Sequence, residues 1–120
     1  MTETTIRPER LAELRAGGTP VDLIDVRTPV EFREVRVPFA RNVPLAALDP
    51  AAFAAGRPVY VVCRAGGRGE RACAALRAAG VDAVNVAGGT LGWAAAGLPV
   101  ARDRGVVSLE RQVRIAAGAL

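Results

Sequence analysis

The feature that most constrains this 120-residue chain is an apolar run that leads into a glycine-rich loop and then into a helical segment. The run covers residues 59–62, the loop residues 63–68, and the helical segment ends near Ala79, before Gly80. Four consecutive apolar residues before such a loop predict a strand buried on both faces of a sheet. Cys63 therefore stands where a central strand ends and a helix begins.

This position suits an anion, and a thiolate is an anion. Backbone N–H groups at a helix start have no intrahelical acceptor and carry the positive end of the helix dipole. Gly66 and Gly67 let the loop adopt positive φ, so that consecutive N–H groups turn inward. Arg64 and Arg68 add two cations. We therefore expect Cys63 to be a nucleophile and not an inert buried thiol.

Short strands and helices alternate along the rest of the chain. Strands are expected at residues 4–6, 21–26, 41–44 and 83–86. Helical segments are expected at residues 8–16, 28–34, 45–48 and 49–55, followed by a last helix that contains Leu91 and Trp93. Thr28, Pro29 and Glu31 have the spacing of a capping box. This alternation predicts one α/β domain with a mainly parallel sheet, in which ligands bind at the carboxyl ends of the strands.

Composition excludes several functional classes. The sixteen basic residues are all arginine and give a net charge of +4, but they are scattered among twelve acids, and only five aromatic residues are present. Nucleic-acid binding is therefore not expected, whereas a small anionic substrate is. The chain has no histidine and only two cysteines. We expect no metal, no cofactor, no disulfide framework, and a reducing compartment.

Three segments, in this order, resemble the signatures of the rhodanese-like (thiosulfate sulfurtransferase) family. The first contains Asp25-Val26-Arg27, Glu31-Phe32, Pro38, Ala40, Asn42 and Pro44. The second is the loop of residues 63–68, which is similar to the family's six-residue active-site loop. The third contains Gly88-Gly89, Trp93 and Gly97-Leu98-Pro99. The resemblance covers about residues 4–101, and residues 1–101 are expected to form the catalytic domain.

The resemblance implies a three-layer α/β/α fold with a central, mainly parallel five-stranded sheet. It also implies that Cys63 takes a sulfane sulfur from thiosulfate or a similar anionic donor and passes it from a persulfide to a thiol or cyanide. The rest of the loop would bind the substrate, namely Arg64, Ala65, Gly66, Gly67 and Arg68. Asp25, Arg27 and Glu31 are expected to support the loop structurally.

Two other functions remain as alternatives. One is a module that senses redox state or binds sulfur through Cys63 without turnover. The other, which the sequence favours less, is a cysteine-based phosphatase or arsenate reductase. Phosphatases of related architecture have one more residue between the cysteine and the arginine than residues 63–68 have, which makes a wider cradle suited to phosphate. The shorter loop fits a single sulfur atom.

Some residues depart from the family's pattern or lie outside its motifs. Arg36 and Phe39 stand where the family usually has His and Gly, and Ala65 replaces a frequent Ser or Thr. These differences bear on substrate preference. Cys73, inside an alanine-rich helical stretch, and Trp93 are both expected to pack in the core.

Residues 102–120 are interpreted as a linker and a C-terminal helix. Leu109, Val113 and Ala116 have the spacing of one helical face, which would dock on the domain or on a second copy in a homodimer. The alternative is that the segment resembles the start of a membrane hairpin fused behind some bacterial rhodaneses. We expect a cytoplasmic protein, at the cytoplasmic face of the inner membrane if the native chain continues past residue 120.

Overall fold

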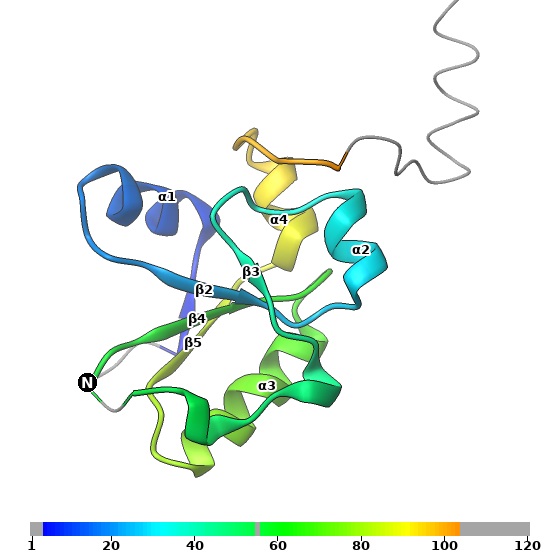
Figure 1. Ribbon diagram of the computed structural model, residues 1–120. Helices are drawn as coiled ribbons and strands as arrows, with labels where there is room; N and C mark the ends of the chain where they lie inside the picture. Colours follow the sequence, from blue (N-terminus) through cyan, green and yellow to red (C-terminus); the bar gives the residue numbers. More distant parts are fainter. Residues whose placement is uncertain (1–3, 55, 104–120) are drawn as a thin grey trace, which may run out of the picture.

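A parallel sheet of five strands organises residues 4–54 and 56–103, which are the residues that the computed structural model describes (Figure 1). The strands are β1 (Thr5–Ile6), β2 (Asp22–Asp25), β3 (Arg41–Asn42), β4 (Val59–Val62) and β5 (Ala83–Val86). Their order in space is β1-β5-β4-β2-β3, and every strand pairing is parallel. The predicted five-stranded parallel sheet is confirmed, with β4 at its centre.

Helices cover both faces of this sheet. They are α1 (Pro8–Ala16), α2 (Pro29–Glu34), α3 (Gly67–Ala78) and α4 (Gly89–Ala95), with short 3-10 turns at Leu45–Ala47 and Pro50–Ala52. Figure 1 shows α1 and α4 on one side of the sheet and α3 on the other, while α2 lies near the carboxyl ends of the strands. The arrangement is the predicted three-layer α/β/α fold.

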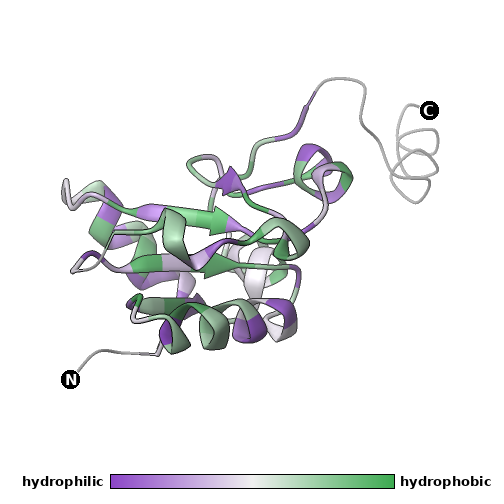
Figure 2. Cartoon of the chain, turned by 60° about the horizontal axis from the view of Figure 1, so that its bottom comes forward, coloured by the Kyte–Doolittle hydropathy of each residue, from purple (hydrophilic) through white to green (hydrophobic). Residues whose placement is uncertain are grey.

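The side chains of β4 alternate between two apolar cores. Val59 and Val61 pack on the α3 side, whereas Tyr60 and Val62 pack towards α1 and α4. All four residues are buried. Figure 2 shows the apolar strands between helices that carry hydrophilic residues on their outer surfaces. Burial on both faces explains why β4 is a continuous apolar run and not an alternating one.

A capping box begins α2 immediately after β2. The Thr28 hydroxyl accepts a hydrogen bond from the Glu31 N–H at 3.3 Å, and the Thr28 N–H donates to Glu31 Oε1 at 3.2 Å. Pro29 occupies the first helical turn, where its missing N–H costs nothing. The predicted cap is confirmed, and it places the Glu31 carboxylate near the carboxyl ends of the strands.

A buried ion pair fixes the chain between β2 and α2. Arg27 Nη2 lies 2.7 Å from Asp25 Oδ2 and also donates to the Val35 carbonyl at 2.6 Å. Asp25 and Arg27 are 0% and 3% exposed. The Asn42 amide donates to the backbone carbonyls of both residues. These contacts hold the backbone between β2 and α2, and support of the cysteine loop by Asp25 and Arg27 stays a prediction.

The end of the described chain is attached to α2. Arg36 and Ala101 exchange two backbone hydrogen bonds, and the Arg36 guanidinium lies 2.7 Å from the Asp103 carboxylate. The expected C-terminal helix and membrane-hairpin segment fall almost entirely in residues 104–120, outside the described residues. Within residues 4–54 and 56–103, no helix has the length and hydrophobicity that crossing a bilayer requires.

Replacing Asp25 by Ala is expected to lower the free energy of unfolding by about 3–5 kcal/mol, because the buried Arg27 charge loses its counter-ion. Asp22→Ala is the matched control on the same strand, since it breaks a pair with Arg41 whose side chains are 44% and 56% exposed. The control should cost about 1 kcal/mol or less. Denaturant unfolding measures both losses, and equal losses would contradict a special role for the buried pair.

Candidate active site

Cys63 is the first residue after the central strand β4, and its side chain is 1% exposed. The Gly66 N–H donates a hydrogen bond to Cys63 Sγ at 2.9 Å, directly before α3 begins at Gly67. Gly66 has φ of +122°, a conformation that glycine adopts far more readily than other residues. The positive φ expected for Gly67 is wrong, because Gly67 already belongs to the first turn of α3.

The start of α4 holds the backbone carbonyls of the loop. The Thr90 N–H donates to the Cys63 carbonyl at 2.7 Å, and the Leu91 N–H donates to the Arg64 carbonyl at 3.1 Å. Gly89 packs so closely that a Cβ there would lie 2.4 Å from the Cys63 oxygen. The carbonyl oxygens of Cys63 and Arg64 are thus bound by α4, while the N–H of Gly66 points to the sulfur.

Arg68 forms a bidentate ion pair with Glu31. Its Nη1 and Nη2 atoms each lie 2.8 Å from one Glu31 carboxylate oxygen. These hydrogen bonds lower the pKa of Glu31 from 4.5 to about 2 and raise the pKa of Arg68. The pair joins α2 to the first turn of α3. Both Nη atoms of Arg68 are bound to the Glu31 carboxylate. Direct binding of substrate by Arg68 therefore stays a prediction.

Arg64 and Ala65 are the exposed residues of the loop between Cys63 and Gly66. Among the described residues, Arg64 has no side-chain hydrogen bond or ion pair, in contrast to Arg68. Its guanidinium is therefore available to an anion that approaches the loop. The absence of a hydroxyl at Ala65 leaves backbone N–H groups and this arginine as the polar groups of that part of the loop.

Asn85 and Gly69 belong to the site although the motifs did not mark them. Asn85, on β5, donates from Nδ2 to the Gly66 carbonyl at 3.2 Å. Gly69 lies in the first turn of α3, and a Cβ there would come within 2.3 Å of Asn85 Oδ1 and 3.5 Å of Cys63 Sγ. Gly69 is a third glycine close behind Gly66 and Gly67, and glycine is unfavourable inside a helix. This is the sequence feature that could have indicated close packing at position 69.

Cys73 and Trp93 are core residues, as expected. Cys73 is 0% exposed, and burial raises the pKa of its thiol to about 11, so it stays protonated near neutral pH. Trp93 is 2% exposed and donates from Nε1 to the Pro99 carbonyl at 2.7 Å. A protonated, enclosed thiol is a poor partner for a second sulfur-transfer step.

Two of the residues that depart from the family's pattern have structural contacts. The charge of Arg36 is paired with Asp103, and its guanidinium also lies over the Phe32 ring. Phe39 packs edge-on against Trp93, with 5.6 Å between ring centroids. Arg36 therefore contributes to packing at the end of α2, and Phe39 contributes to packing against Trp93 of α4.

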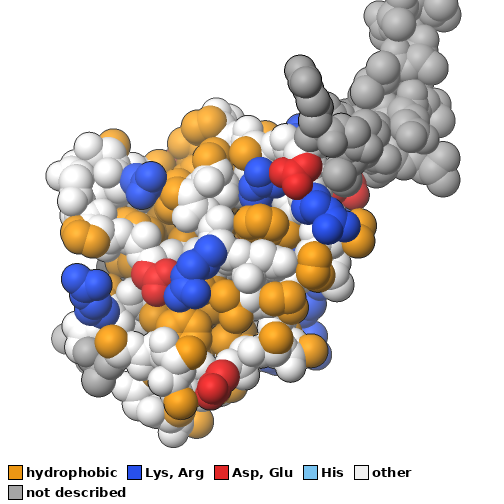
Figure 3. Space-filling view, viewed as in Figure 1, with side chains coloured by type: hydrophobic (Ala, Val, Ile, Leu, Met, Phe, Trp, Pro, Cys, Tyr) orange, Lys and Arg blue, Asp and Glu red, His pale blue; other side chains and the backbone are white. Residues whose placement is uncertain are grey.

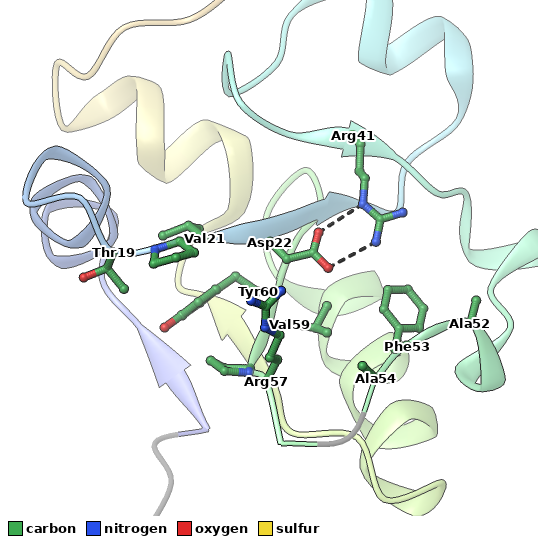
Figure 4. Close-up of a pocket in the computed structure, with 12 residues that line it drawn as sticks. Thr19, Val21, Asp22, Arg41, Ala52, Phe53, Ala54, Arg57, Val59 and Tyr60 are labelled. Atoms are coloured by element: carbon green, nitrogen blue, oxygen red, sulfur yellow. Dashed lines mark hydrogen bonds and ion pairs between the residues drawn. The ribbon is translucent and has the colours of Figure 1, made fainter.

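A cavity of about 540 Å³ lies at the amino ends of β2 and β4, whereas Cys63 follows the carboxyl end of β4 (Figure 4). Asp22, Arg41, Phe53 and Arg57 are among its lining residues. On the face drawn in Figure 3, basic side chains form separate groups, two of them beside acidic side chains. The residues that line the cavity include none of the cysteine loop, residues 63–68.

The chain belongs to the rhodanese-like family, since the Rhodanese-like domain model matches residues 7–96. A sulfurtransferase of Allochromatium vinosum is 35% identical over 83% of this chain and 96% of that protein. An uncharacterised Synechocystis protein is 37% identical over 99% of this chain and 68% of that protein. A crystal structure from Staphylococcus saprophyticus is 32% identical, with a TM-score of 0.72, and covers 82% of this chain and 99% of that chain.

Family membership and the named relative support sulfur transfer as the general class of activity. The position of the cysteine agrees with this class, because the loop offers an N–H to one sulfur atom at the carboxyl edge of a parallel sheet.

Glu31→Gln tests the ion pair between α2 and α3. Gln keeps the size and the capping position, but it removes the charge that Arg68 binds. Because the folded pKa of Glu31 is depressed to about 2, its stabilisation is complete above pH 4.5 and is lost as the pH falls through 2. We expect a loss of about 1 kcal/mol at pH 7 in denaturant unfolding, and a smaller loss at pH 3.

The matched control is Glu13→Gln, which removes a carboxylate from a pair with Arg10 whose side chains are 67% and 55% exposed. Its effect should be about 0.5 kcal/mol or less. A loss for Glu31→Gln that does not change between pH 7 and pH 3 would contradict the ion-pair explanation.

Proposed function

We propose that the protein transfers a sulfane sulfur from thiosulfate, or a similar anionic donor, to a thiol or cyanide through a persulfide on Cys63. The observation that carries the proposal is the 2.9 Å hydrogen bond from the Gly66 N–H to Cys63 Sγ at the start of α3. An N–H donor and a helix start favour a negative charge on that sulfur. The charge is required when the thiolate attacks and again when it is released.

In the first step the Cys63 thiolate attacks the outer sulfur of thiosulfate. A new S–S bond forms, the S–S bond of thiosulfate breaks, and sulfite leaves with the electron pair. In the second step an acceptor thiolate or cyanide attacks the outer sulfur of the persulfide, and the Cys63 thiolate leaves. Neither step needs a proton from the protein, which agrees with a chain that contains no histidine.

The exposed Arg64 is the residue best placed to attract the donor anion. It follows the nucleophile directly, and within the described residues it has no counter-ion. A guanidinium can give two parallel hydrogen bonds to a sulfonate-like group. Arg68 lies farther from Cys63 in the sequence and is bound to Glu31. Its main role in this proposal is to fix the position of the loop.

Incubation with thiosulfate should add the mass of one sulfur atom and release one sulfite for each chain, because Cys63 keeps the outer sulfur. Intact-mass spectrometry and a sulfite assay measure the two products. Cys63→Ser should gain nothing, and Cys73→Ala, the matched control, should gain the sulfur normally because Cys73 is buried. Absence of the gain, or a gain without sulfite, would contradict thiosulfate sulfur transfer and favour a sensing module.

Phosphatase activity should be absent with a generic aryl phosphate. The loop has four residues between Cys63 and Arg68, and the arginine side chain is bound to Glu31 and not free to hold a phosphoryl group. Release of the phenol, measured by absorbance against Cys63→Ser as the blank, should not exceed that blank. A Cys63-dependent release would overturn the use of loop length to separate the two chemistries.

A further inference from the structure

Asn85 is a buried amide at a position where the rest of the strand is apolar. It lies on β5, level with Val61 of β4, and is 4% exposed. Its backbone N–H is already used, because it donates to the carbonyl of Thr4, the residue before the edge strand β1. A polar side chain enclosed in this way costs free energy unless it has a specific partner. The hydrogen-bond partner of the Asn85 side chain therefore indicates its role.

That partner is the Gly66 carbonyl, the same residue whose N–H donates to Cys63 Sγ. Asn85 Nδ2 donates to this oxygen at 3.2 Å, and the Glu70 N–H donates to it at 2.9 Å. Two donors on one carbonyl fix the orientation of the Gly66–Gly67 peptide. Gly66 has φ of +122° and ψ of −27°, and without these bonds a glycine would rotate readily. Its N–H would then leave the sulfur.

The amide and α3 are also fitted to each other through Gly69. A methyl group at Gly69 would overlap Asn85 Oδ1, at 2.3 Å, and would touch Cys63 Sγ, at 3.5 Å. The amide therefore occupies space that a side chain at position 69 of α3 would otherwise fill. Among the described residues, Asn85 Oδ1 has no hydrogen-bond partner, so the side chain is held by its donor end alone.

We propose that Asn85 is a positioning residue for sulfur transfer. It ties the Gly66 carbonyl to β5, and by this contact it keeps the Gly66 N–H aimed at the negative charge that Cys63 carries. The proposal rests on the proposed function in one respect, which is that Cys63 reacts as a thiolate. Preorganised N–H donors of this kind lose their effect when the backbone that carries them is free to turn.

The test is the pH–rate profile of Cys63 alkylation by iodoacetamide, in a Cys73→Ala background where Cys63 is the single thiol. Asn85→Leu keeps the approximate volume and removes the amide. Gly69→Ala leaves Asn85 in place but displaces its side chain from Gly66. Both variants should shift the profile to higher pH and slow alkylation at pH 7 about tenfold. The limiting rate at high pH should stay unchanged.

Asn42→Leu is the matched control. It also removes an amide that donates to two backbone carbonyls, those of Asp25 and Arg27, but it does not touch Gly66. Its stability loss should equal or exceed that of Asn85→Leu, while its alkylation profile should coincide with that of the parent. If Asn85→Leu does not fold, Gly69→Ala, which replaces glycine by a better helix former, decides the question.

An unchanged profile in the folded variants would overturn the proposal, even if their melting temperatures fall, because a purely structural residue lowers stability alone. Alkylation needs no sulfur donor, so this outcome is independent of whether thiosulfate is the donor. Sulfur loading measured by intact mass judges the proposed function separately. A shifted profile without any sulfur loading would leave Asn85 as a positioning residue and reject the sulfur-transfer chemistry.

Discussion

The Cys63 sulfur is almost fully buried, and the N–H of Gly66 donates a hydrogen bond to it. The chain contains no histidine, and the described residues contain no cluster of metal-ligating side chains. Under the proposed function, this hydrogen bond stabilises the negative charge that the sulfur carries when it reacts. Three neighbouring elements hold the residues around this hydrogen bond. The start of α4 binds the carbonyls of Cys63 and Arg64, Asn85 of β5 binds the Gly66 carbonyl, and Glu31 of α2 binds Arg68.

Features that depend on neighbouring residues could be predicted from the sequence. The central strand, the start of α3 and the capping box of Thr28 and Glu31 each require a pattern within a few residues. The parallel sheet followed from the alternation of strands and helices, because such connections permit few topologies. The place of Cys63 at the carboxyl edge of the sheet was fixed by the same reasoning.

Contacts between distant segments could not be predicted in this way. The resemblance implies that Arg68 binds the substrate, but Glu31, 37 residues earlier in the chain, binds both of its Nη atoms. Asn85 was one residue of a strand until the fold placed it against Gly66. The sequence predicts positive φ for both Gly66 and Gly67, but of the two only Gly66 has it, because sequence alone does not show at which residue a helix begins.

The contacts of α2 and Arg36 with residues 101–103 connect the end of the described chain to the elements around Cys63. Asp103 is tied to Arg36, which follows the end of α2, and Glu31 near the start of that helix grips Arg68 in the first turn of α3. Two ion pairs, one near each end of the six-residue helix α2, therefore link residues 101–103 to the first turn of α3, where the cysteine loop ends.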